Sequence, residues 1–123
     1  MQNDEKKLAQ LLAGLVPAEA TLIGPFELDG HPDHEATGRA CLIAARECGV
    51  RMGRYPIWAW YRDAAELRSQ RMARRFVLSS QAQCAKKQAI AQFHSQTVER
   101  PGGAIVPSHV LEYFYRPYEI FLF

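Results

Sequence analysis

Two histidines three residues apart, His31 and His34, are the residues of this 123-residue chain whose types and spacing best suit chemistry. They stand in the tetrapeptide His-Pro-Asp-His, so that a carboxylate, Asp33, lies between them. Imidazole binds metal ions and transfers protons near neutral pH, and a neighbouring group usually orients the ring for either task. The tetrapeptide therefore indicates a metal or proton-transfer site, with a capped helix start carrying two solvated histidines as the alternative.

This motif is only part of a site. A catalytic zinc ion usually takes three protein ligands and keeps one position open. The other histidines, His94 and His109, belong to no second cluster of ligand type, and we expect them to be ordinary surface or core residues. The sequence thus predicts a chemistry that this chain does not complete alone.

The elements that position the motif follow from apolar spacing and from glycine and proline. Leucines at helical spacing predict a helix over about residues 4–14, ended by Gly14, and a short strand follows at 21–23. A second helix is expected over about 34–48, with Asp33 as its N-cap and Gly49 after its end. The histidine motif then lies just beyond a strand end, where open α/β sheets bind their ligands.

The rest of the chain is predicted in the same way. We expect strands at 55–61, 76–78 and 118–123, and helices at 80–94 and 108–114. Trp58 and Trp60 fall in the first of these strands, where packing in the core is favoured over lining a pocket. One group of arginines is interpreted as a solvated face rather than a phosphate site; it comprises Arg68, Arg71, Arg74 and Arg75.

Composition limits the class of protein. Apolar residues make up 48% and charged residues 23%, which is typical of one folded domain over residues 1–123. A formal net charge of +2 is too small to predict a nucleic-acid partner, and no apolar run is long enough to span a membrane. Three cysteines without a C-x-x-C pair favour a reducing, cytoplasmic location.

Four segments in this order resemble the carboxyl-terminal part of the LmbE-like (PIG-L) family of zinc-dependent N-deacetylases. They read GHPDHEATGRA at 30–40, YPIWAW at 55–60, KKQAI at 86–90 leading to FHSQ at 93–96, and YFYRPYEIF at 113–121. The resemblance covers the chain from about residue 20 to its end. It is greatest to bacterial members that are thought to deacetylate N-acetylglucosamine-type sugars.

The resemblance implies a Rossmann-like layered α/β fold, incomplete in this chain, with a zinc ion beyond the strand ends. His34 matches the zinc ligand of the family motif. His31 matches the histidine thought to stabilise the oxyanion or transfer a proton, and Asp33 matches the aspartate thought to hold that histidine in its protonation state. These roles imply a metal-dependent amide hydrolase acting on an N-acetylated sugar.

One family motif has no match in this chain. The amino-terminal H-P-D-D-E motif supplies a histidine and an aspartate to zinc and a further aspartate as general base, and the sequence does not contain it. We therefore expect the chain to be one part of a deacetylase, completed by a missing amino-terminal half or associating with itself. The alternative is a non-catalytic binding or assembly module derived from the same fold.

Overall fold

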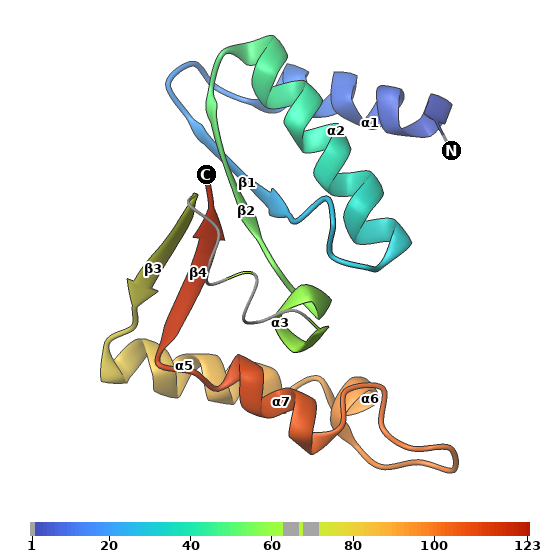
Figure 1. Cartoon of the computed structure of the whole chain (residues 1–123), viewed down its shortest axis with the longest axis vertical. Coiled ribbons are helices and arrows are strands. Elements are labelled where there is room, and N and C mark those ends of the chain that lie inside the picture. Colours follow the sequence, from blue (N-terminus) through green and yellow to red (C-terminus); the bar gives the residue numbers. More distant parts are fainter. Residues whose placement is uncertain (1, 63–66, 68–71) are drawn as a thin grey trace. The chain divides into compact units, whose positions relative to one another are not determined.

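The computed structural model describes residues 2–62, 67 and 72–123, and it is a mixed α/β structure with a four-stranded mixed sheet and flanking helices. The strands are β1 (Thr21–Pro25), β2 (Arg51–Tyr55), β3 (Ala73–Val77) and β4 (Tyr118–Leu122). The helices are α1 (Gln2–Leu15), α2 (Pro32–Cys48), α3 (Trp58–Arg62), α5 (Ser80–Ala91), α6 (His94–Thr97) and α7 (Ser108–Phe114) (Figure 1). The sheet order is β1-β2-β4-β3, with β1 and β2 parallel and β2 and β4 antiparallel.

The chain forms two compact units. The first unit comprises Met1–Arg74 and Ile120–Phe123, and the second comprises Arg75–Glu119. Both β3 and β4 run from one unit into the other. The single domain expected over residues 1–123 stays a prediction.

The first unit is built on a β1–α2–β2 crossover. Residues Thr21 to Pro25 of β1 pair in register with Arg51 to Tyr55 of β2, and α2 connects the two strands. The buried face of α2 consists of small residues, which are Gly38, Ala40, Cys41, Ala44 and Ala45. A bidentate ion pair joins α1 to α2. Arg39 donates from Nε and Nη2 to the two carboxylate oxygens of Glu5, at 3.1 and 2.6 Å.

A glycine permits the close approach of α2 to the end of β1. A Cβ on Gly38 would lie 2.6 Å from the carbonyl oxygen of Pro25 and 3.0 Å from Cα of Glu27, both of them backbone atoms. At the other end of α2, Gly49 has a φ of 66° and donates its N–H to carbonyl groups of the last turn, as the sequence predicts. Glycines therefore fix both the packing and the length of this helix.

The strand predicted over 55–61 is wrong. Strand β2 lies over Arg51–Tyr55 and ends before Pro56, and the segment with both tryptophans is helix α3. This segment starts a helix at a point where the neighbouring residues offer no cap, because the side chain of Asp29, about thirty residues earlier, accepts the first N–H groups of α3. Trp60 is 3% exposed, which confirms the core interpretation for this residue.

The N-cap predicted for the second helix is also wrong. Helix α2 begins at Pro32, and its N-cap is His31, whose Nδ1 accepts a hydrogen bond from the Asp33 backbone N–H at 3.3 Å. Proline suits the first helical position because its φ is already helical and no N–H is lost there. Asp33 therefore lies within the first turn, with an exposed side chain.

The other predicted elements are present with shifted ends. Helix α1 passes Gly14 and ends at Leu15, α5 ends at Ala91, and β3 lies at 73–77 instead of 76–78. Helix α7 and strand β4 lie where the sequence predicts them. Of the arginine group, Arg74 and Arg75 are exposed, whereas Arg68 and Arg71 lie outside the described residues.

The second unit contains α5, α6 and α7. Lys86 of α5 forms an ion pair with Glu119, and Val110 of α7 is buried. Helix α5 has no buried residue, although the sequence gives it an apolar stripe. Among the helices that the structure describes, none combines the length and the hydropathy needed to cross a bilayer.

Candidate functional site

The candidate site lies where β1 and β2 end. Since these strands are parallel neighbours, their carboxyl ends meet at one edge of the sheet, and Phe26 N–H donates to the Tyr55 carbonyl at 2.9 Å just beyond the ladder. The loop after β1 leads to the first turn of α2, and the segment after β2 leads to α3. This edge is the position at which open α/β sheets bind ligands.

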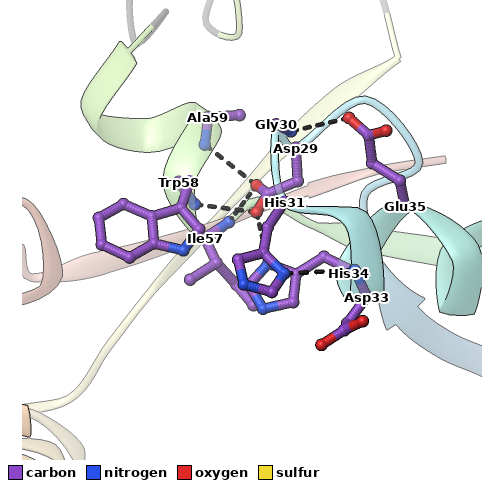
Figure 2. A network of polar contacts seen from close by, with 9 residues as sticks. All are labelled: Asp29, Gly30, His31, Asp33, His34, Glu35, Ile57, Trp58 and Ala59. Carbon is purple, nitrogen blue, oxygen red and sulfur yellow. Dashed lines mark hydrogen bonds and ion pairs between the residues drawn. The ribbon is translucent and has the colours of Figure 1, made fainter. Parts of the chain in front are cut away.

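A buried carboxylate, Asp29, joins these two segments. It is 1% exposed, and its Oδ1 accepts hydrogen bonds from the backbone N–H groups of Ile57 at 2.7 Å and Ala59 at 3.0 Å. Its Oδ2 accepts from the N–H of Trp58 at 3.0 Å (Figure 2). Asp29 thus caps the first turn of α3 and holds it beside the loop that follows β1.

The same carboxylate orients His34. The ring nitrogen Nδ1 of His34 lies 2.7 Å from Oδ2 of Asp29, and 25% of the histidine side chain is exposed. Burial raises the pKa of the Asp29 carboxyl, but the hydrogen bonds from the three backbone N–H groups and from His34 together outweigh this effect. The pKa of Asp29 therefore lies below its ordinary value. An ionised carboxylate only accepts hydrogen bonds, so the shared proton belongs to Nδ1 of His34, and in the neutral ring Nε2 carries the lone pair.

His31 has the opposite arrangement. Its Nδ1 accepts the Asp33 backbone N–H, so the proton of a neutral His31 ring belongs to Nε2. The rings of His31 and His34 are stacked, with their centroids 4.4 Å apart and their planes inclined by 27°. The site therefore presents a hydrogen-bond donor from one ring beside an acceptor from the other.

The predicted site residues are only partly brought together. His31 and His34 lie side by side, but the Asp33 carboxylate makes no hydrogen bond or ion pair within the described part of the chain. The carboxylate that holds a histidine is Asp29, which sequence reasoning missed. An Asp-Gly pair usually indicates a surface turn, so nothing local distinguishes this acid. The one available signal was that α3 has no capping residue of its own before Trp58.

Gly30 sits between the buried carboxylate and the first histidine. It has a φ of 84°, and its N–H donates to Oε1 of Glu35 at 2.9 Å, which ties the loop to the first turn of α2. A Cβ at this position would lie 1.6 Å from Nη1 of Arg62. The backbone conformation therefore favours glycine here, whereas the exposed Arg62 side chain can move away from an added Cβ.

The fit of these residues to a metal ion is incomplete. His34, with an acceptor nitrogen turned away from an orienting carboxylate, has the arrangement of a zinc ligand and its supporting acid. Over residues 2–62, 67 and 72–123, however, no three His, Cys, Asp or Glu side chains gather into a group that could hold a metal. His94 and His109 are exposed residues of the second unit.

The chain was compared with protein-family models, with curated proteins and with solved structures, and none of the three comparisons finds a match.

Proposed function

We propose that this chain supplies part of the site of a zinc-dependent N-deacetylase, which hydrolyses an acetamide on an N-acetylglucosamine-type sugar. The proposal begins from the resemblance to LmbE-like (PIG-L) enzymes, and a Rossmann-like fold and a cytoplasmic location belong to it. One observation carries it: a buried carboxylate holds Nδ1 of His34, so that Nε2 is the nitrogen left for a ligand. The place of this histidine beyond two parallel strand ends also supports it.

The two histidines would have separate roles. His34 would hold zinc through Nε2, and zinc, when bound, supplies a Lewis acid and an available water nucleophile near neutral pH. His31 would donate from Nε2 to the amide oxygen, where negative charge grows as the carbonyl is attacked. The stacked rings put these two functions next to each other. We assign no separate step to Asp33, whose carboxylate has no partner within the described residues.

The remaining ligands and the general base must come from elsewhere. The described residues provide one oriented histidine and no complete metal group. In the proposed enzyme, an amino-terminal half with the H-P-D-D-E motif, or a second polypeptide carrying it, supplies the rest.

A second candidate function is a non-catalytic binding or assembly module. The incomplete metal group among the described residues favours it. The isolated chain should hold zinc weakly or not at all under either candidate, so metal analysis of the chain joined to an H-P-D-D-E segment separates them: stoichiometric zinc that is lost in His34→Ala supports the deacetylase part, and its absence from the folded fusion supports the module.

The decisive test is complementation. The chain is fused behind a segment that carries the H-P-D-D-E motif, and release of acetate from N-acetylated sugars is measured with and without a chelator. We expect chelator-sensitive activity that is lost in His34→Ala and lowered in His31→Ala. His94→Ala, which changes an exposed histidine of the second unit, is the matched control and should keep full activity. A folded, zinc-loaded fusion that stays inactive on a panel of such sugars would refute the assignment.

A further inference from the structure

We infer that Asp29 is a positioning residue, which fixes the tautomer of His34 and thereby decides whether its Nε2 presents a lone pair or an N–H to a ligand. The inference rests on the proposed function for the identity of that ligand, but the tautomer itself is a property of this chain alone. Nothing in the resemblance assigns a role to Asp29, whose contacts appear only in the folded structure.

The hydrogen bonds of the carboxylate leave one choice of tautomer. An ionised carboxylate has about four acceptor positions, and Asp29 fills them with three backbone N–H groups and the His34 ring. If His34 carried its proton on Nε2, a lone pair on Nδ1 would face a carboxylate oxygen at 2.7 Å with no proton between them. Asp29 is 1% exposed, so its carboxylate has no solvent contact to replace the lost bond. The Nδ1–H form of His34 is the one that the site stabilises.

This choice reverses the usual preference of the side chain. In solvated peptides the neutral imidazole ring favours the Nε2–H form, which would present a donor to a ligand rather than a lone pair. A metal ion or a proton to be removed requires the lone pair instead. Asp29 therefore makes Nε2 of His34 an acceptor rather than a donor.

The carboxylate also fixes the ring in space. The backbone of His34 belongs to the first turn of α2, whereas Asp29 is tied to the backbone after β2 through residues 57–59. The His34 ring is thus held through its own backbone in α2, which follows β1, and through Nδ1 by a carboxylate that is bonded to the segment after β2. Gly30, bonded to Glu35 of α2, closes the loop between them.

A simple capping role for Asp29 makes a different prediction. A cap for α3 needs only the acceptor oxygens, and it is indifferent to the proton of the His34 ring. The substitution Asp29→Asn separates the two roles. Its amide oxygen can take the position of Oδ1, where two N–H groups converge. The NH2 group is then in the position of Oδ2, where it faces His34 and the Trp58 N–H loses its acceptor. That NH2 group donates to Nδ1 of His34 and so favours the Nε2–H tautomer.

The experiment is nitrogen NMR of the metal-free full chain, labelled with ¹⁵N in its histidine rings, at about pH 8.5, well above the ordinary imidazole pKa. Protonated and unprotonated ring nitrogens differ widely in chemical shift, and His34→Gln assigns the His34 signals. In the unsubstituted chain we expect Nδ1–H as the major form of His34 and Nε2–H as the major form of His31. In Asp29→Asn the major form of His34 should change to Nε2–H, with His31 unchanged.

The matched control is Asp33→Asn, which changes an exposed carboxylate next in sequence to His34 and should alter neither ring. A major Nε2–H form of His34 in the unsubstituted chain overturns the positioning role, and this reading does not depend on whether Asp29→Asn folds. An unchanged His34 tautomer in folded Asp29→Asn also overturns it and leaves Asp29 as a cap alone. Because neither metal nor substrate is present, failure of the deacetylase assay does not affect this result.

Discussion

Two helices of this protein begin in contrasting ways. Helix α5 has a cap beside it in the sequence: the Ser79 hydroxyl accepts the Ala82 N–H at 3.1 Å. Helix α3 has none, and its first turn is bonded by Asp29, about thirty residues earlier. The first kind of start is visible beside the helix in the sequence, whereas the second shows there only as a missing cap before Trp58. The remote cap is also the one that forms part of the candidate site.

The two caps differ in what else they hold together. Ser79 is exposed, and the helix that it begins buries no residue. Asp29 is buried, and its bonds connect the ends of β1 and β2 and a histidine of α2. We therefore expect the loss of the remote cap to disturb the first unit as a whole, and the loss of the local cap to affect one helix end.

The largest effect is expected for Asp29→Ala. Removing this carboxylate leaves three backbone N–H groups and a ring N–H without their acceptor, in buried or partly buried positions, which should lower the free energy of unfolding by about 3–5 kcal/mol. Urea unfolding followed by circular dichroism measures the change. Asp33→Ala is the matched control and should stay within about 0.5 kcal/mol. Equal effects of the two substitutions would contradict the network.

The second-largest loss of stability is expected where α2 packs closely against the end of β1. Gly38→Ala places a methyl group 2.6 Å from the Pro25 carbonyl oxygen, so α2 must move away from β1, at a cost of about 1–3 kcal/mol. Gly14→Ala, in α1, meets no atom within 4 Å and should instead stabilise the chain by about 0.5–1 kcal/mol. Thermal unfolding of both variants checks the opposite signs. A neutral Gly38→Ala would show that α2 is not held this closely.

The local cap should matter less. Ser79→Ala removes one acceptor from the start of α5 and should cost about 1 kcal/mol. Hydrogen exchange at the Ala82 amide reports the change directly, because this N–H loses its bond. A loss as large as that of Asp29→Ala would remove the distinction between the two caps.

Acid should weaken the remote cap and leave the local one unchanged. The folded-state pKa of Asp29 lies below its ordinary value, so the carboxylate binds its proton less readily in the folded chain than in the unfolded one. Its contribution to stability is therefore complete above the unfolded-state pKa, near 4, and is lost as pH falls through the folded value. Urea midpoints measured between pH 7 and pH 3 should fall less steeply in Asp29→Asn than in the unsubstituted chain. A parallel fall in both would contradict the assignment.

Local pattern predicted much of the fold. The end of α2 at Gly49, the start of α5 after Ser79, and helix α7 all follow from residues next to one another in the sequence. Strand β2 was missed because its five residues, RMGRY, contain two arginines and a glycine in place of an apolar run. Only its pairing with β1 and β4 makes this segment a strand.

The part of the candidate site that depends on neighbouring residues was predictable, and the part that depends on a distant segment was not. The spacing of His31 and His34 was enough to predict that they lie together, because the N-cap and the first turn of one helix hold them. The role of Asp29 depends on a segment 28–30 residues away, and an Asp-Gly pair gives no sign of burial. Asp33 was chosen as the cap because its residue type suits one, but proline at the first helical position moved the helix start to His31.

The most direct test of the central claim is the zinc content of the complemented chain. The fusion with an H-P-D-D-E segment is loaded with zinc, desalted and subjected to elemental analysis, together with its His34→Ala and His31→Ala variants. We predict about one zinc ion per chain in the parent fusion and in His31→Ala, and a large loss in His34→Ala, because of these two neutral rings His34 is the one whose Nε2 carries a lone pair for a metal. Equal zinc in both variants, whether kept or lost, would contradict the separation of ligand from donor.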